Sequence, residues 1–143
     1  MEKTSQLEKL VLTRSFHVAP EKVWGAWIDA GALRIWFGQT EAAWQAEWDV
    51  RAGGRYRLVM RDSSGTDYTV QGVYREVQAN RRLVFTWDQR GSPFDHEALV
   101  TVDLRPAAGG TELTFTLDPV LDPRAPDAWR GDFTRLGRLL QTD

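Results

Sequence analysis

Few residues in this chain have the type and spacing that catalysis or metal binding requires. His17 and His96 are the two histidines, and neither belongs to an HExxH pattern or to a comparable set of metal ligands. The serines lie outside any nucleophile-elbow pattern. The chain has no cysteine, which excludes disulfides, thiol catalysis and thiolate metal sites. We therefore expect no metal site and no cofactor.

Glu76 and Tyr74 are the two side chains for which a role in proton transfer can be argued. In the segment YTVQGVYREV, period-two alternation places Glu76 on the same face as Tyr68, Gly72 and Tyr74, and we expect this face to point inward. A carboxyl or phenol group enclosed there could donate or accept a proton. In the simpler interpretation, Glu76 forms a structural ion pair with an arginine on a neighbouring strand or lies at a water-exposed strand end.

The aromatic residues indicate a different chemistry, the binding of an apolar or aromatic molecule. The chain has seven tryptophans, three tyrosines and six phenylalanines. Their rings offer apolar area, and a tyrosine hydroxyl adds a polar group that can orient a ligand. Aromatic stripes also commonly fill a core, and both interpretations stay open. The candidate ligand-binding residues are Trp36, Phe37, Tyr56, Leu58, Met60, Tyr68, Tyr74, Trp87, Trp129 and Phe133.

The first elements that must position these residues are a strand and two short helices. Apolar residues of one parity run from Leu10 to Val18, which is typical of a half-buried strand. Pro20 suits a first helical turn, and the residues at 23, 24 and 27 then form one apolar helical stripe. Leu33, Trp36 and Phe37 repeat the stripe after a glycine, which predicts a second short helix.

The rest of the chain reads as strands followed by one helix. Alternating segments occur at 54–62, 68–77, 81–87, 96–104 and 109–117, and short turn-rich links between them favour an antiparallel meander. The segment 127–141 places apolar residues at helical spacing and predicts a C-terminal amphipathic helix. This order is typical of an α+β architecture. A helix across the concave face of a long, twisted sheet commonly leaves an apolar cavity at the ends of the contact.

Length and charge limit the classes of function. The 143 residues suit a single domain spanning 1–143, whose core can be stable without disulfides or metal ions. The formal net charge is −2, and the arginines of the strands alternate with apolar residues, so we expect a solvated face and no nucleic-acid partner. The N-terminus lacks the apolar core of a signal peptide, and no apolar run is long enough for a membrane span. We expect a cytoplasmic protein without membrane insertion, either a monomer or a homodimer.

With these segments in place, the chain resembles the family of activator-of-heat-shock-protein-90-ATPase homologues, within the START-like helix-grip superfamily. The resemblance rests on LTRSFHVAPEKVWGAWIDAGALRIWFG, DVRAGGRYRLVMR, GVYREV with RRLVFTW, VTVDL, GGTELTFTL, and the spaced Leu136 and Leu139. It implies a curved antiparallel sheet of about six or seven strands wrapped around a C-terminal helix, two short helices after the first strand, and a cavity between sheet and helix. The family often has Gly-Trp in the last helix, where this chain has Gly131-Asp132.

Three hypotheses on function follow. The first is a domain that binds a small apolar or aromatic molecule, or a lipid, in the cavity. The second is a cyclase- or hydrolase-like enzyme that uses Glu76 or a cavity tyrosine such as Tyr74. The third is a protein-interaction module with a chaperone as its partner. The namesake co-chaperones carry a separate N-terminal chaperone-binding domain, and we expect no counterpart of it in these 143 residues.

Overall fold

The structure is a computed structural model that describes residues 9–29, 32, 36, 45–61, 67–90, 96–120 and 125–140. Apart from β2, the elements over these residues follow the order expected from the sequence. They are β1 (Leu10–Phe16), α1 (Pro20–Ile28), β2 (Gln45–Trp48), β3 (Arg55–Arg61), β4 (Asp67–Gln78), β5 (Arg82–Arg90), β6 (His96–Ala107), β7 (Gly110–Asp118) and α3 (Ala125–Leu140). Residues 32 and 36 are helical, but most of the second short helix predicted from the sequence lies outside the described residues.

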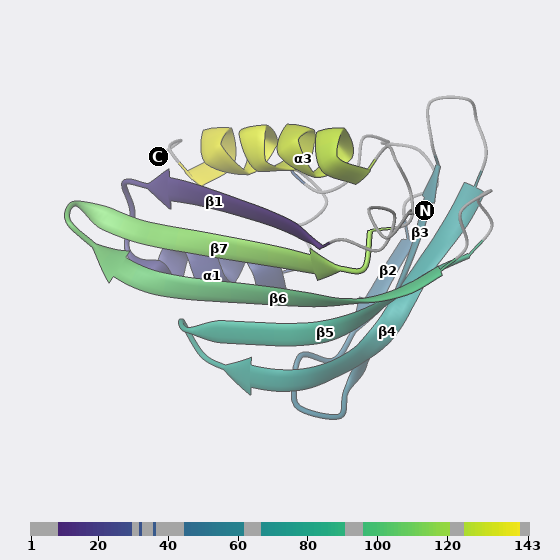
Figure 1. Cartoon of the computed structure of the whole chain (residues 1–143). Coiled ribbons are helices and arrows are strands. Elements are labelled where there is room, and N and C mark those ends of the chain that lie inside the picture. Colours follow the sequence, from purple (N-terminus) through teal and green to yellow (C-terminus); the bar gives the residue numbers. More distant parts are fainter. Residues whose placement is uncertain are drawn as a thin grey trace.

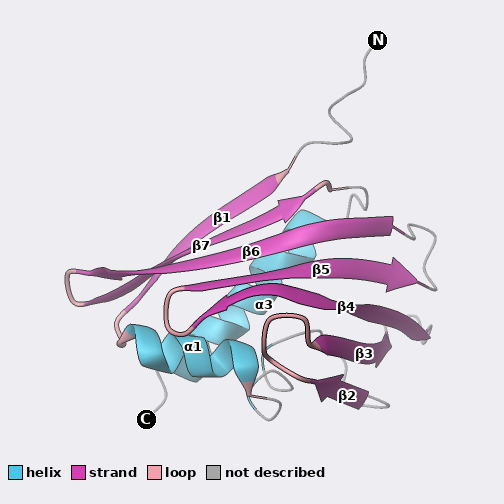
Figure 2. Cartoon of the chain, turned by 90° about the horizontal axis from the view of Figure 1, so that it is seen from below, coloured by secondary structure: helices cyan, strands magenta, loops and turns pink. Residues whose placement is uncertain are grey.

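The described strands form one seven-stranded sheet with the order β1-β7-β6-β5-β4-β3-β2. Every neighbouring pair is antiparallel. The sheet curves, and both α1 and α3 lie on its concave side, as Figures 1 and 2 show together. The prediction of an α+β helix-grip fold is therefore confirmed. The sequence analysis did not identify β2, a strand of four residues at one edge of the sheet.

Helix α1 is held against the sheet by its first turn and by the segment before it. Pro20 stands in the first turn of the helix, where its missing N–H costs nothing. The Lys22 N–H donates to the Ala19 carbonyl at 3.0 Å. The buried Thr111 hydroxyl on β7 donates to the Val18 carbonyl at 2.7 Å. The Thr111 bond ties the segment before α1 to β7, and the buried residues of the helix, which include Trp27, belong to the core.

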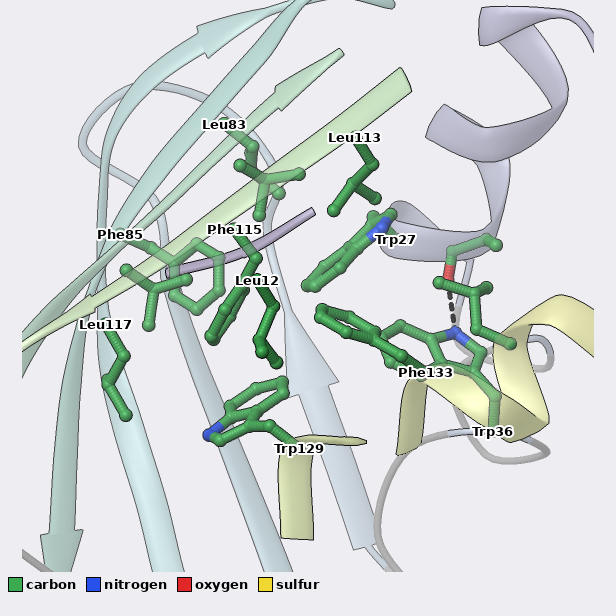
Figure 3. Close-up of a cluster of buried hydrophobic side chains, with 14 of the residues drawn as sticks. Leu12, Trp27, Trp36, Leu83, Phe85, Leu113, Phe115, Leu117, Trp129 and Phe133 are labelled. Atoms are coloured by element: carbon green, nitrogen blue, oxygen red, sulfur yellow. Dashed lines mark hydrogen bonds between the residues drawn. The ribbon is translucent and has the colours of Figure 1, made fainter. Parts of the chain in front are cut away.

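The core lies between the concave face of the sheet and the two helices. Alternate residues of β7 are buried there, as the sequence pattern predicts, and Leu113, Phe115 and Leu117 are each at most 1% exposed. Helix α3 contributes an apolar stripe that includes Phe133 and Leu136. Figure 3 shows side chains from strands and helices converging on this volume. Burial of this apolar area is the main favourable free energy of folding.

Candidate functional site

The candidate site is the concave face of the sheet where aromatic side chains meet α3. Close to α1, the rings are packed against one another: the Trp27 and Trp36 ring centroids lie 4.8 Å apart, and the Phe115 and Phe133 centroids lie 5.2 Å apart. Phe115 also lies 4.4 Å from Trp129, centroid to centroid. Figure 3 shows these rings side by side. This part of the concave face is a packed aromatic core.

Trp36 is fixed at both its ring and its backbone. Its indole N–H donates to the Ala26 carbonyl at the end of α1 at 2.8 Å, the dashed line in Figure 3. Its own carbonyl accepts from Arg135 Nε at 3.1 Å. Arg135 also donates to the buried Asp132 carboxylate on the same helix. The Trp36 side chain is 0% exposed, so these contacts make it an anchor between α1 and α3.

Asp132 and Arg135 are residues that the sequence analysis did not propose for the site. Asp132 was noted only because it replaces the tryptophan that the family often has. One feature of the sequence could have indicated this pair. Asp132 and Arg135 are an acid and a base at i, i+3 on the predicted helix, and side chains at that spacing can meet on one face. That spacing is common on exposed helices, and nothing in it indicates that the pair is turned toward Trp36.

A second aromatic group lies farther along the concave face, on β3, β4 and β5. Tyr56, Tyr74 and Phe85 are buried, and their ring centroids lie 5.5 to 5.7 Å apart. The Tyr56 hydroxyl donates to the Thr86 carbonyl at 2.6 Å. Among the described residues, no hydrogen bond or ion pair of the Tyr74 side chain is recorded. The two hydroxyls therefore differ: one is committed to the backbone and the other is available.

Burial sets the protonation state of both tyrosines. It raises the pKa of Tyr74 above its ordinary value. Burial also raises the pKa of Tyr56, with smaller contributions from the nearby Tyr74 and Asp88. A phenol with a raised pKa keeps its proton at neutral pH and is a poor general base. Both tyrosines therefore carry a neutral O–H group, which can donate a hydrogen bond.

The raised pKa values predict a loss of stability in alkaline solution. In the unfolded chain these tyrosines ionise near pH 10, whereas the folded state keeps their protons to higher pH. Stability should therefore be unaffected below about pH 10 and fall above it, by up to about 1.4 kcal/mol per pH unit for each tyrosine. Thermal unfolding at several alkaline pH values measures the slope. A double Tyr56→Phe, Tyr74→Phe variant should show a shallower slope, and an unchanged slope would contradict the assignment.

Trp87 and Trp129 connect the sheet to α3 beside the tyrosines. Their ring centroids lie 5.2 Å apart, and both side chains are buried. The Trp87 indole N–H donates to Gln89 Oε1 at 3.3 Å, and Gln89 is itself only 9% exposed. A buried amide on an apolar face gives this end of the site polar groups as well as rings.

The remaining candidate ligand-binding residues are placed less completely. Leu58 is buried on β3 opposite Val70. Met60 and Tyr68 are opposite each other in the β3–β4 register, and their side chains lie outside the described part of the structure. Phe37 also lies outside the described residues. The assignment of these four residues to a ligand site stays a prediction.

The prediction that Glu76 faces inward is wrong, because a bulge interrupts the alternation of β4. Tyr74 pairs with Phe85 but Glu76 pairs with Val84, so the register shifts by one residue between them. Paired residues share a face, and Val77, opposite Leu83, now packs against the core instead. Bulges of this kind turn every later side chain of a strand to the other face.

On the outer face, Glu76 belongs to an ion-pair network. Arg82 Nε lies 3.6 Å from Glu76 Oε1 and 3.6 Å from Asp103 Oδ1. Gln78 Nε2 also donates to Glu76. About two-fifths of the Glu76 side chain is exposed, at 41%. The structural ion pair named in the sequence analysis is therefore the role that Glu76 has. The enzyme hypothesis is left with a cavity tyrosine such as Tyr74.

The described residues contain no cluster of three or more His, Asp or Glu side chains that could hold a metal ion. They also contain no helix long and apolar enough to cross a membrane. What the concave face offers chemically is a set of aromatic rings, a neutral phenol O–H and a buried amide. These groups suit recognition of an uncharged, largely apolar molecule.

Comparison with known families gives a match over most of the chain. Residues 17–140 match the family described as "Activator of Hsp90 ATPase homolog 1-like protein". A curated relative, the mouse (Mus musculus) "Activator of 90 kDa heat shock protein ATPase homolog 2", is 31% identical over 77 residues, which is 54% of this chain. The matched part spans 20% of that relative's length.

Solved structures share the fold at low sequence identity. A protein from Chromobacterium violaceum superposes with a TM-score of 0.82 at 23% identity, covering 95% of this chain and 99% of that one. A protein from Mesorhizobium loti gives a TM-score of 0.77 at 24% identity, covering 95% and 99%. CalU16 from Micromonospora echinospora gives 0.70 at 20% identity, covering 94% and 76%. These likenesses establish the fold.

Proposed function

The chain belongs to the Activator of Hsp90 ATPase homolog 1-like family, and we propose that it acts as a small-molecule-binding domain. The proposed ligand is an apolar or aromatic molecule, or a lipid, in a cavity between the concave face of β3–β5 and α3. The family assignment and the START-like fold support a ligand-binding domain in general. The residues on the concave face support the finer statement about the ligand.

The observation that carries the proposal is the Tyr74 hydroxyl. It lies on a face where Phe85 and Trp87 are buried, and no hydrogen bond of the Tyr74 side chain is recorded among the described residues. A hydroxyl that makes no bond within the protein is free to donate to an acceptor from outside it. A ligand with a carbonyl or ether oxygen supplies the missing acceptor. Its apolar or aromatic body is accommodated by rings such as Trp87 and Trp129.

Native mass spectrometry of freshly purified protein, followed by tryptophan-fluorescence titration, tests the proposal. The titration uses a panel of aromatic ketones, each matched to the hydrocarbon of the same shape, and a set of fatty acids. Trp87 and Trp129 are buried together, so a ligand bound beside them should quench their emission with saturation. A clean apo mass, and no saturable quenching by any compound of the panel, would contradict a small-molecule function.

Replacing Tyr74 by phenylalanine separates the hydroxyl from the ring. We expect Tyr74→Phe to weaken binding of a ketone about tenfold and to leave binding of its matched hydrocarbon unchanged, because only the ketone uses the hydroxyl. Tyr56→Phe is the control, since its hydroxyl already donates to Thr86. Equal weakening of ketone and hydrocarbon by Tyr74→Phe would show that the hydroxyl does not select the ligand.

A second proposal is that the chain stimulates the ATPase of a chaperone. It is favoured by the family assignment and by the likeness to the mouse protein, whose name describes an activator of the 90 kDa heat shock protein ATPase. ATP hydrolysis by that chaperone, measured with and without an excess of this chain, tests it. A rate that rises with saturation supports the proposal, and an unchanged rate at every concentration removes it.

A further inference from the structure

A cavity lies on the outer face of the sheet, opposite the face that carries the aromatic side chains. Its volume is about 380 Å³, within the range of about 300–1,000 Å³ that small-molecule sites occupy. Arg55 and Arg57 alternate along β3 with the buried Tyr56 and Leu58, so they point to this outer face. The charged residues of its lining are Arg55, Arg57, Asp88 and Glu97.

The floor of this outer cavity is a local distortion of the sheet. The β4–β5 ladder of paired residues is interrupted at Gly72 and Val73. The Val73 N–H donates to the Thr86 hydroxyl at 2.9 Å, while the Thr86 carbonyl accepts from the Tyr56 hydroxyl at 2.6 Å. A Cβ atom on Gly72 would lie 2.0 Å from the Thr86 carbonyl oxygen. A glycine inside a strand often marks a place where another backbone or a ligand approaches closely.

The walls of the outer cavity carry opposite charges at its two ends. The register places Arg57, Gln71, Asp88 and Glu97 in one row across β3, β4, β5 and β6. Asp88 is already paired, since Arg90 Nε lies 2.6 Å from its Oδ1.

Three charged groups of this cavity remain available. Arg55, Arg57 and Glu97 are exposed, and no ion pair of theirs is recorded among the described residues. Arg55 and Arg57, two positions apart on one face, form a positive end on β3. Glu97, on β6, forms the negative end.

We propose that the outer cavity binds a small zwitterion, with its carboxylate held by Arg55 and Arg57 and its ammonium group by Glu97. Three strand spacings separate Arg57 from Glu97, about 14 Å between Cα atoms. Arginine and glutamate side chains shorten that gap without closing it. A ligand with its charges separated by a short chain therefore fits better than an α-amino acid. This site goes beyond the proposed function, because it lies on the opposite face of the sheet and recognises charge.

The test is a titration of ¹⁵N-labelled protein with 6-aminohexanoate, followed by the amide signals of Gln71, Val73 and Asp88. Hexanoate and hexylamine, which each carry one of the two charges, are titrated in parallel. The variants are Arg57→Gln and Glu97→Gln, both at exposed positions where folding is expected to be unaffected. Arg81→Gln is the matched control, since Arg81 is exposed and does not line the cavity.

We expect saturable shifts with 6-aminohexanoate and about tenfold weaker binding of either single-charge compound. Each cavity variant should also bind 6-aminohexanoate about tenfold more weakly, and Arg81→Gln should bind it as the wild type does. Absence of saturable shifts, equal binding of hexanoate, or unchanged binding by Arg57→Gln would each overturn the proposal. The fluorescence titration with apolar ligands is independent, so failure of one site is distinguishable from failure of the other.

Discussion

Replacing Phe133 by alanine is expected to lower the free energy of unfolding by about 4 kcal/mol. Phe133 is 1% exposed and packs edge-on against Phe115, with the ring centroids 5.2 Å apart. Its ring also lies about 6 Å from those of Trp27, Trp36 and Trp129. Deleting it removes the burial of one ring and leaves a cavity among rings that are fixed by other contacts. Chemical denaturation followed by far-ultraviolet circular dichroism measures the loss.

Phe133→Leu is the control for this prediction. Leucine keeps much of the apolar volume, so the expected cost is below about 2 kcal/mol. A loss below about 1 kcal/mol for the alanine variant would show that the rings around residue 133 collapse into the space. The rigidity assumed for Trp36, whose ring and carbonyl are both hydrogen-bonded, would then be wrong.

The strands and the fold class could be predicted because alternation and turn residues are local signals. Segment 109–117 alternates, and the structure places β7 at Gly110–Asp118 with Leu113, Phe115 and Leu117 buried. Pro20 was expected to begin a helix, and α1 begins there. In both cases the residues that decide the structure lie within one turn or one strand of each other, so tertiary contacts did not have to be known.

The position of Glu76 could not be predicted because it depends on one extra residue in β4. Strict alternation from Tyr74 puts Glu76 inward, but the register shift after Tyr74 turns it outward to Arg82. The sequence has no glycine at the bulge to mark it. Gly72, the glycine within this strand, instead marks the place where β4 and β5 approach closely. A bulge is fixed by pairing with the neighbouring strand, which single-strand alternation does not contain.

The role of Trp36 likewise depends on contacts distant in sequence. Its spacing with Leu33 and Phe37 predicted an apolar stripe, which is consistent equally with a core residue and with a ligand-lining residue. The deciding contacts come from Ala26 and Arg135, which are 10 and 99 positions away. Of the candidate ligand-binding residues with described side chains, Tyr74 is therefore a more informative target than Trp36, because its hydroxyl is not committed.

Replacing Gly72 by alanine is expected to destabilise the protein by about 3 kcal/mol. The added Cβ would lie 2.0 Å from the Thr86 carbonyl oxygen and 2.6 Å from its hydroxyl oxygen. Because the first of these atoms belongs to the backbone of β5, a rotamer change cannot relieve the overlap. Strands β4 and β5 must separate, which weakens both the Tyr56 hydroxyl bond and the Val73 N–H bond to Thr86.

Gly25→Ala is the matched control for Gly72→Ala, and chemical denaturation of both variants is the measurement. Gly25 lies inside α1, and a Cβ atom there would meet nothing within 4 Å. Alanine favours a helix over glycine by up to about 1 kcal/mol, so this variant should be as stable as the wild type or more so. Wild-type stability of Gly72→Ala would contradict the close approach of β4 and β5 at Thr86. Since that approach forms the floor of the outer cavity, it would also remove the structural basis of the zwitterion site.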